Sequence, residues 1–468
     1  MGLSAIARTI QESRLMASPV LTTPEKETYC CPEAPQTASD TGLPAPLLGH
    51  LIFNILHARQ EVSGRVLADT MGLSFSVIED VLSDLRQHQF IDVSRSMGFG
   101  LVSSDFTLTE AGRQRARELS KVCQYVGPAP VPLQQYERVV EMQRLNTGWL
   151  TPEVLTKAYR HMVIDRESLD QIGPAVNSGK SLLIYGAPGN GKTLIAEALI
   201  NLDSTPVFIP YAIEHNGTIV QIFDPRCHRP VEEHDESAAL FSVAPAHDGR
   251  WVRCKRPFIA TGGELTLEML ELSFIESSKV LDAPCHLKAN NGIYLVDDFG
   301  RQKVSAQELL NRWIVPMENR KDHLGVPAGG KLPVPFEAML IFSTNLNPED
   351  LGDEAFLRRI QYKMFVRNPD PREFSEIFRS VCAKSGVVCS DEVLTDFIQR
   401  HYLDTYKPFR RCHPRDLISH AIDFVRFHGE KPELTKSLLD YAFNSCFLDE
   451  NLCGRGQSKR DHKQDPFG

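Results

Sequence analysis

The sequence has no hydrophobic run long enough to cross a membrane. No stretch approaches the ~18 apolar residues that a spanning helix requires. The residues at the amino terminus also lack the long apolar core of a secretory signal peptide. Both absences predict a cytoplasmic protein that does not insert into a membrane.

Paired cysteine motifs are missing as well. The 11 cysteines include no C-x-x-C pair, which disfavours both a disulfide framework and a zinc site with ligands at the usual spacing. Three Cys-His dipeptides occur, at Cys227-His228, Cys285-His286 and Cys412-His413, but neighbouring residues rarely aim both side chains at one ion. We therefore expect free thiols in a reducing compartment.

The chain also lacks an excess of positive charge. Its formal net charge is −9 and its isoelectric point is near 5.9, which is a poor basis for general nucleic-acid binding. The guanine-reading pattern N-K-x-D does not occur. The composition, with 42% hydrophobic and 24% charged residues, is that of an ordinary globular chain, and the length predicts about three domains.

What the chain does contain is a phosphate-binding loop. The pattern G-x-x-x-x-G-K-[ST] is formed by Gly186, Ala187, Pro188, Gly189, Asn190, Gly191, Lys192 and Thr193, followed by Leu194. An apolar run over 181–185 predicts a buried strand before the loop, and 193–200 predicts a helix after it. Glycines let several backbone N–H groups face one anion at a helix N-terminus. The pattern predicts that Lys192 contacts the β- and γ-phosphates and that the Thr193 hydroxyl binds Mg²⁺.

Polar side chains follow two further predicted strands. The apolar run 292–296 ends in Asp297 and Asp298, and the run 338–344 ends in Asn345. Buried parallel strands deliver such groups to the carboxyl edge of a sheet. We expect Asp297 to hold the Mg²⁺ shell, Asp298 to orient or deprotonate the attacking water, and Asn345 to bind that water or the γ-phosphate.

The order of these segments resembles that of an AAA+ ATPase over residues 150 to 445, and within that superfamily the hairpin-rich stretches are nearest to MoxR-like and related ring ATPases. The resemblance implies ATP and Mg²⁺ as cofactors, Asn345 as sensor 1 and Arg415, in Cys412-His-Pro-Arg-Asp-Leu417, as the sensor 2 residue. It assigns the arginine finger to Arg359, with Arg358 as the alternative. Because the finger acts on a neighbouring subunit, a homo-oligomer is implied, most often a ring of six.

One residue departs from the family pattern. The family usually has Glu after the Walker B Asp, whereas this chain has Asp298. The shorter side chain draws the carboxylate back, and a misplacement on the order of 1 Å can cost about a hundredfold in rate. Slow hydrolysis is therefore one of the outcomes that the sequence allows.

The pattern along the chain predicts an α/β protein with a P-loop NTPase parallel-sheet core, a C-terminal helical lid and a preceding α+β winged-helix-like domain. Its expected parts are a disordered arm (1–43), the winged-helix-like domain (44–125), a linker (126–155), the ATPase core with hairpin insertions (156–370), the lid (371–450) and a disordered tail (451–468). Within the second part, helices are predicted from Leu47 to His57, around 63–71 and over 74–86 with Ser74 as cap, followed by two short strands.

The charge of the third helix bears on the role of that domain. It carries Glu79, Asp80 and Asp84 against Arg86, a poor surface for a phosphate backbone. Protein interaction is therefore favoured over DNA. The DNA alternative remains open because further polar and basic residues lie on the wing and the last helix, namely Ser103, Arg113, Arg115 and Arg117.

Insertions are expected between the phosphate-loop helix and the Walker B strand. The turn His215-Asn-Gly-Thr218 predicts a hairpin between 207–209 and 219–223, and a second hairpin is expected around 247–249. The returning strand of the second one holds Arg250, Trp251, Arg253, Lys255 and Arg256. We interpret it as a solvated strand face, in preference to a nucleic-acid contact. No aromatic-Gly pore loop is evident.

Two functions remain open from the sequence. One is an ATP-hydrolysing ring that remodels or assembles an unidentified protein client. The other is a slow nucleotide-dependent binding switch or DNA-associated regulator that acts through the winged helix.

Overall fold

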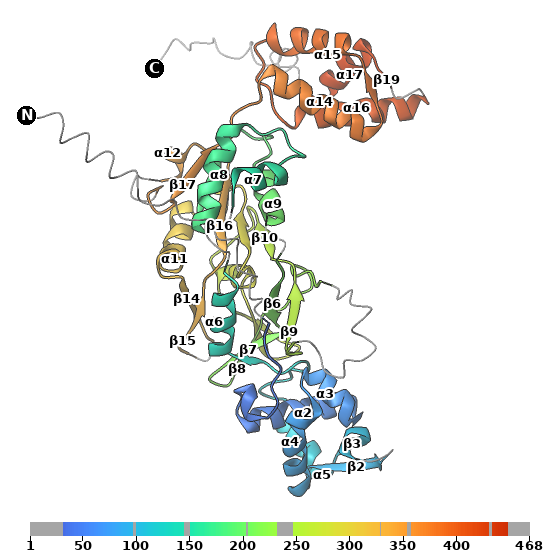
Figure 1. The fold of residues 1–468 in the computed structure, drawn as a ribbon, viewed down its shortest axis with the longest axis vertical. Helices are drawn as coiled ribbons and strands as arrows, with labels where there is room; N and C mark the ends of the chain where they lie inside the picture. The colour runs from blue at the N-terminus through green and yellow to red at the C-terminus, as the bar shows by residue number, and fades with distance from the viewer. Residues whose placement is uncertain are drawn as a thin grey trace, which may run out of the picture.

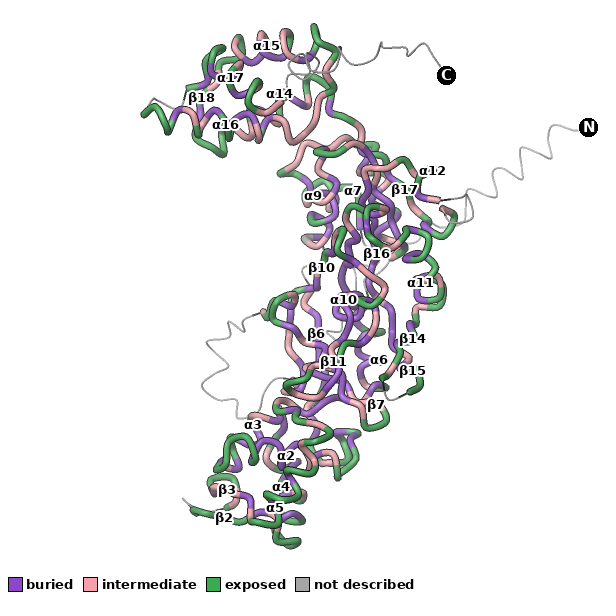
Figure 2. Tube along the Cα trace, turned by 180° about the vertical axis from the view of Figure 1, so that it is seen from behind, coloured by how far each residue is buried: buried purple, intermediate pink, exposed green. Residues whose placement is uncertain are grey.

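The computed structural model describes residues 31–96, 100–144, 150–202, 205–231, 247–327, 329–352, 357–429 and 433–447. Figure 1 shows an elongated arrangement in which an N-terminal part, a central part with most of the strands and a C-terminal helical part follow one another along the longest axis. Buried residues concentrate along the middle of each part (Figure 2). Among the described residues, no helix combines the length and hydropathy that a bilayer crossing requires.

The N-terminal part combines helices with a small antiparallel sheet of order β1-β3-β2. Its elements are α2 (Ala45–Arg59), β1 (Glu61–Ser63), α3 (Gly64–Met71), α4 (Phe75–Gln87), β2 (Ile91–Ser96), β3 (Ser104–Leu108) and α5 (Glu110–Leu119). The hydroxyls of Ser63 and Thr109 cap α3 and α5 by accepting backbone N–H groups. Ser74 precedes α4 as expected, but its hydroxyl lies 3.0 Å from that of Ser76 and does not cap the helix. The predicted helices and the two predicted strands lie within a few residues of their expected positions, whereas β1 was not predicted. The winged-helix interpretation stays a prediction.

The structure differs from the expected disorder over 31–43. A 3₁₀ turn, Ser39–Thr41, lies there, and Thr41 and Leu43 are buried. The backbone of Pro32 accepts a hydrogen bond from Asp248 N–H at 2.9 Å. Short apolar side chains and backbone contacts therefore fix a segment whose composition suggested disorder, while 1–30 and 448–468 lie outside the described residues.

The central part is built on a five-stranded parallel sheet of order β10-β13-β16-β5-β17. Its strands are β5 (Leu182–Tyr185), β10 (Phe258–Thr261), β13 (Ile293–Val296), β16 (Met339–Thr344) and β17 (Tyr362–Phe365). Parallel strands put their carboxyl ends at one edge of the sheet. The phosphate loop after β5, the two aspartates after β13 and Asn345 after β16 therefore share one edge.

Helices cover both faces of this sheet. Leu182 and Ile184 face a layer that includes α7 (Pro152–Ala158), α8 (Arg166–Ser178) and α9 (Lys192–Ala198), whereas Leu183 faces α11 (Ala306–Asn319). Such alternation is what a strand buried on both faces requires. α11 begins with a capping box between Ser305 and Glu308, and the short α12 (Pro348–Leu351) follows β16. These layers confirm the predicted α/β class with a parallel-sheet core.

A second sheet of order β11-β12-β8-β7-β4 lies between the central sheet and the N-terminal part. Its strands are β4 (Val131–Pro132), β7 (Ala212–His215), β8 (Thr218–Gln221), β11 (Ser273–Ile275) and β12 (Val280–Asp282). Around it lie α6 (Leu133–Met142), α10 (Cys285–Lys288) and two ribbons, β6 (Val207–Pro210) with β9 (Trp251–Cys254) and β14 (Lys321–Gly325) with β15 (Lys331–Pro335). The segment expected as a linker thus contributes β4 and α6 to a packed core.

Two insertion predictions need correction. The turn at Asn216 and Gly217 does form a hairpin, but it joins β7 to β8, while the run 207–209 pairs with β9. The segment with four cations is not a uniformly solvated face, because Arg250 and Trp251 are 0% and 2% exposed and Arg256 is also buried, whereas Lys255 is exposed. Residues 232–246, which would complete the second predicted hairpin, lie outside the described residues.

The second sheet and the N-terminal part share one apolar core. Ala212, Ile219 and Val280 of the sheet pack with the N-terminal helices. At the junction the guanidinium of Arg250 pairs with the Asp248 carboxylate at 2.8 Å, with both side chains 0% exposed, and it also donates to Thr41 O and Gln135. The N-terminal part is therefore held against the sheet by buried contacts.

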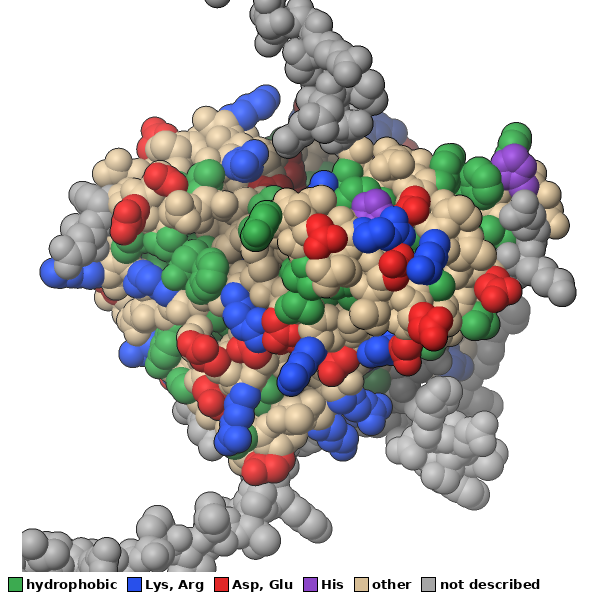
Figure 3. All heavy atoms as spheres, turned by 90° about the horizontal axis from the view of Figure 1, so that it is seen from above, with side chains coloured by type: hydrophobic (Ala, Val, Ile, Leu, Met, Phe, Trp, Pro, Cys, Tyr) green, Lys and Arg blue, Asp and Glu red, His purple; other side chains and the backbone are tan. Residues whose placement is uncertain are grey.

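The C-terminal part contains four main helices, α14 (Pro371–Ser385), α15 (Asp391–Ile398), α16 (His413–His428) and α17 (Lys436–Cys446). A π-helical turn, Gln399–Leu403, and two short strands, β18 (Val388–Cys389) and β19 (Glu433–Leu434), connect them. The core of this part is formed by side chains such as Phe374, Phe378, Leu417 and Leu439. Positive and negative side chains are interspersed on the face seen in Figure 3.

Candidate nucleotide-binding site

The phosphate loop leaves β5 at the carboxyl edge of the central sheet and enters α9. Gly189 and Gly191 have φ of 79° and 80°, a left-handed conformation that glycine adopts without a steric penalty. A Cβ at Gly189 would lie 2.5 Å from Cys412 Sγ, so this position also leaves no room for a side chain. The loop therefore has the strand, glycine turn and helix that the motif requires.

Lys192 is held at the centre of the loop. Its ammonium group donates to the carbonyls of Gly186 and Ala187 at 3.0 and 3.1 Å and to Asn345 Oδ1 at 2.5 Å. Burial lowers the pKa of Lys192, and the nearby carboxylates of Asp297 and Asp298 oppose that shift. A buried cation that contacts neutral oxygens of the loop and of Asn345 is well placed to bind a phosphate group.

Thr193 and Asp297 form the second contact of the site. The Thr193 hydroxyl donates to Asp297 Oδ2 at 2.8 Å, which brings the start of α9 and the end of β13 together. A hydroxyl and a carboxylate are oxygen ligands of the kind that Mg²⁺ prefers. These two residues therefore fit the predicted metal-binding role.

Asp298 and Asn345 lie beside this pair. Asn345 Nδ2 donates to Asp298 Oδ1 at 3.0 Å, so Asn345 bridges Lys192 and Asp298. The backbone of Asp298 has φ of 49°, which is uncommon for a residue other than glycine and more frequent for Asp and Asn. The side chain of Asp298 is exposed, whereas Asp297 is half-buried.

The C-terminal part contributes Cys412, which begins the predicted sensor 2 segment, together with Arg410 and Arg411, which the sequence did not single out. Cys412 N–H donates to Gly189 O at 2.8 Å, and Arg411 N–H donates to Asn190 Oδ1 at 3.3 Å. Arg410 lies close enough for its charge to lower the pKa of Lys192 further, after burial. The Arg410-Arg411 pair, three residues before Pro414, was the one signal in the sequence that could have indicated this contact.

Arg415 is placed differently from what was expected. Its guanidinium pairs with the neighbouring Asp416 at 3.0 Å, and its side chain is 72% exposed. Leu194, the last residue of the predicted loop, is 55% exposed. The structure thus brings Lys192, Thr193, Asp297, Asp298 and Asn345 together, and places Arg410 rather than Arg415 beside them.

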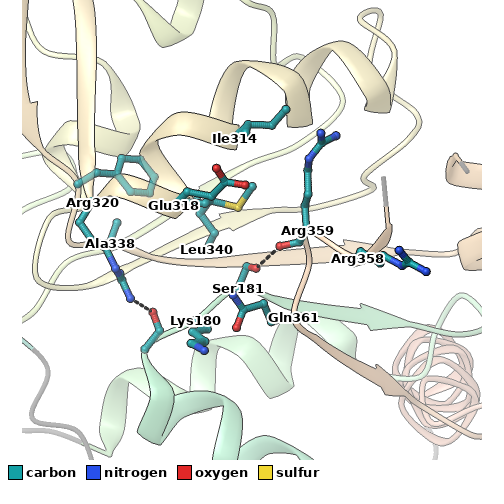
Figure 4. A pocket seen from close by; sticks show the side chains of 13 residues that line it. Lys180, Ser181, Ile314, Glu318, Arg320, Ala338, Leu340, Arg358, Arg359 and Gln361 are labelled. Carbon is teal, nitrogen blue, oxygen red and sulfur yellow. Dashed lines mark hydrogen bonds between the residues drawn. The ribbon is translucent and has the colours of Figure 1, made fainter. Parts of the chain in front are cut away.

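Arg358 and Arg359 lie at the opposite edge of the sheet. They line a cavity of about 540 Å³ together with Lys180, Arg320 and Glu318. The cavity is at the start of β5, β16 and β17, and β5 alone spans about 13 Å between it and the phosphate loop. Figure 4 shows the two arginine side chains leaving the backbone in different directions. Neither arginine is therefore at the nucleotide site of its own chain.

The strand order, the phosphate loop and the acidic end of β13 together define the fold of a P-loop NTPase. Over 252 residues the chain is 24% identical to spastin of Anopheles gambiae, an AAA ATPase, and the match covers 53% of this chain and 23% of spastin. The chain thus matches less than a quarter of that relative's length. A family profile described as a domain of unknown function (DUF8689) matches residues 370–445, which are the C-terminal helices.

The matches among solved structures include NtrX of Brucella abortus. That match has 15% identity, a TM-score of 0.34 and coverage of 68% of this chain and 58% of that one. RuvB of Thermotoga maritima, a Holliday junction branch migration motor, has 12% identity, a TM-score of 0.34 and coverage of 66% and 74%. Both scores are too low to bear on the fold, which is assigned from the strand order and the site.

Proposed function

We propose that this chain binds ATP with Mg²⁺ and hydrolyses the terminal phosphoanhydride bond. The observation that carries the proposal is the contact of Thr193 with Asp297, next to a buried Lys192, at the carboxyl edge of a parallel sheet. In P-loop NTPases these positions hold the metal and the phosphates. Mg²⁺, when bound, neutralises charge on the β- and γ-phosphates.

Each side chain has a role in that scheme. Thr193 and Asp297 supply the oxygens that hold the metal ion, while Lys192 and the loop N–H groups bind the phosphates. Asp298 is the general base or the orienting group for the attacking water, and Asn345 fixes the Asp298 carboxylate through its Nδ2 group. The nucleotide assigned is ATP because the resemblance is to ATPases and no guanine-reading motif is present.

We assign the role of the sensor 2 arginine, the cation that the C-terminal part brings to the nucleotide, to Arg410 in place of Arg415. Arg410 lies beside the phosphate loop, where the Arg410 Cβ is 3.8 Å from the position of a Cβ on Gly189. Arg415 is instead paired with Asp416 and largely exposed. A guanidinium near the γ-phosphate stabilises negative charge there.

We further propose that the site is completed by a neighbouring copy of the chain in a closed ring. The location of Arg358 and Arg359 at the amino-terminal edge of the sheet supports this, because a head-to-tail contact would bring that edge to the phosphate edge of the next subunit. A cation supplied in trans contributes about 10³–10⁵ in rate in related systems. Arg359 is the first candidate and Arg358 the alternative.

We propose that the ring remodels or assembles a protein partner, and that the N-terminal part, as a winged-helix-like module, presents the contact surface. Glu79, Asp80 and Asp84 lie on exposed positions of α4, which disfavours a phosphate backbone as partner.

The second candidate is a slow nucleotide-dependent switch. The identity of Asp298, one methylene shorter than Glu, favours it, because the carboxylate would then reach the attacking water poorly. In that case ATP drives assembly and hydrolysis is incidental.

The experiment that separates these functions is steady-state ATP turnover against protein concentration for the unmodified chain, Arg359→Ala and Arg358→Ala. We expect specific activity to rise with concentration and to collapse in one of the two variants. Tight ATP binding with negligible turnover at every concentration would support the switch. Loss of ATP binding is not expected in either variant, since both residues lie away from their own loop.

A further inference from the structure

Four positions of the phosphate-loop pattern accept any residue, and Asn190 has the one polar side chain among them. This side chain does not face the anion site. The residue is 0% exposed. Its Nδ2 group donates to Asn368 Oδ1 at 2.8 Å, and its Oδ1 atom accepts Arg411 N–H at 3.3 Å. The side chain is therefore engaged with segments outside the loop.

Those segments are the connection from the central sheet to the C-terminal helices and a connection between two of those helices. Asn368 lies between β17 and α14, where the chain leaves the central sheet, and Arg411 lies just before α16, in the return connection that passes the phosphate loop. Cys412 N–H adds a bond to Gly189 O at 2.8 Å. A single buried amide thus touches both connections while its own backbone forms part of the phosphate loop.

The hydrogen bonds allow only one orientation of the two amides. Arg410 also donates to Asn368 Oδ1, and a guanidinium can only donate. Asn368 must therefore present its oxygen, so Asn190 must present Nδ2 to it and Oδ1 to the Arg411 N–H group. Asn190, Asn368 and Arg410 consequently form a chain in which each group fixes the next.

The return connection is anchored on its other side as well. The Arg411 guanidinium, 13% exposed, donates to Val163 O and lies 3.9 Å from the Glu373 carboxylate. These contacts fix Arg411 but leave Arg410 dependent on Asn368. The position of Arg410 over the loop therefore depends on the amide of Asn190.

We propose that Asn190 is a positioning residue that acts through Asn368 to set the guanidinium of Arg410 over the phosphate loop. The inference rests on the proposed ATPase function for its effect on rate. A change of the loop backbone on ATP binding would move Asn190 and, through it, both connections. The C-terminal helices would thereby respond to the state of the loop through these contacts and through the Cys412–Gly189 hydrogen bond.

Asn190→Ala, Asn368→Ala and the double variant test the proposal in the full-length chain. We expect ATP affinity within about threefold of the unmodified value, because neither amide faces the anion, and kcat lower by about 10- to 100-fold, as misplacement on the order of 1 Å costs about a hundredfold. The double variant should be no slower than the slower single variant, since residues in one network are not additive.

Hydrogen exchange supplies a readout that needs no turnover. The amides of Arg411 and Cys412 should exchange faster in Asn190→Ala, with and without ATP. The matched control is Asn54→Ala, which removes a buried amide in the N-terminal part that donates to the carbonyls of Cys123 and Tyr125 and should change neither kcat nor these two exchange rates.

Each contrary outcome has a distinct meaning. Unchanged exchange at Arg411 and Cys412 overturns the coupling, and so do single effects that multiply in the double variant. A loss of ATP affinity as large as that of Lys192→Ala would place Asn190 in the anion site itself and also overturn it. If the unmodified chain fails to bind ATP, the proposed function falls, while the exchange measurement without nucleotide still decides the role of Asn190.

Discussion

Replacement of Asp298 by Glu is expected to slow ATP turnover, although Glu is the residue that related ATPases usually carry. The backbone at Asp298 has φ of 49°, a conformation that Asp and Asn adopt more readily than other side chains. The carboxylate is also fixed by Asn345 Nδ2 at 3.0 Å, while Asn345 Oδ1 accepts from Lys192. The site is therefore shaped around the shorter side chain.

The magnitude follows from the geometry. Glu extends the side chain by one C–C bond, about 1.5 Å, which carries the carboxylate past the Asn345 amide. Misplacement on the order of 1 Å costs about a hundredfold in rate, and strain at a left-handed residue is on the order of 1 kcal/mol. We expect kcat of Asp298→Glu to fall by roughly 100-fold, with ATP affinity retained.

The assay is phosphate release at saturating ATP and Mg²⁺, with the dissociation constant of ATP measured separately. Asp298→Asn is the matched variant, because it keeps the length and the tolerance for this backbone but removes the charge, and it should also be slow. Turnover of Asp298→Glu at or above that of the unmodified chain would refute the reasoning, since reach and not backbone conformation would then limit the rate.

Three further predictions concern binding and stability. Lys192→Ala should abolish ATP binding while leaving the N-terminal part folded; calorimetric titration with ATP and circular dichroism check this, and undiminished affinity would contradict the phosphate-loop assignment. Arg250→Ala should destabilise the protein by about 3–5 kcal/mol, because it leaves the Asp248 carboxylate buried and unpaired. Lys255→Ala, at an exposed position of the same segment, should change the free energy of unfolding in denaturant little. Equal effects of the two substitutions would argue against the buried pair. Although burial opposes ionisation, hydrogen bonds from His286 and Arg312 lower the pKa of Asp322 from 3.8 to about 2. The Asp322 carboxylate therefore contributes about 2 kcal/mol to the free energy of unfolding above pH 4, and this contribution is lost as the pH falls from about 4 to 2. Asp322→Asn should flatten the plot of unfolding free energy against pH in that window.

The central fold could be predicted from sequence because its signals are local. The run before Gly186 and the run before Asp297 are apolar and rich in branched side chains, and each ends at a motif residue. The strands, the loop and the edge of the sheet where they meet can therefore be predicted from residues that are neighbours in the chain. The structure confirms the parallel-sheet α/β core and brings Lys192, Thr193 and Asn345 to one edge. The catalytic roles of these residues stay predictions.

The remaining features depend on contacts between distant segments, which no local pattern encodes. Arg410 and Arg415 are both basic residues near the start of α16, and only the return path of the chain places the first over the loop. Arg250 lies in a charged run whose composition predicts solvent exposure. In the structure it is buried, where it pairs with Asp248 and donates to Thr41 O. Such positions are set by tertiary packing, which overrides the composition of the surrounding residues.

The N-terminal part and the second sheet share one hydrophobic core, and this limits how the chain can be shortened. Ala212, Ile219 and Val280 form an apolar sheet face that water would reach if the N-terminal helices were removed. A chain shortened to its nucleotide-binding portion would expose this apolar surface and would tend to self-associate. Oligomers of such a fragment would then result from the removal of the N-terminal helices, so ring formation is best measured on the full-length protein.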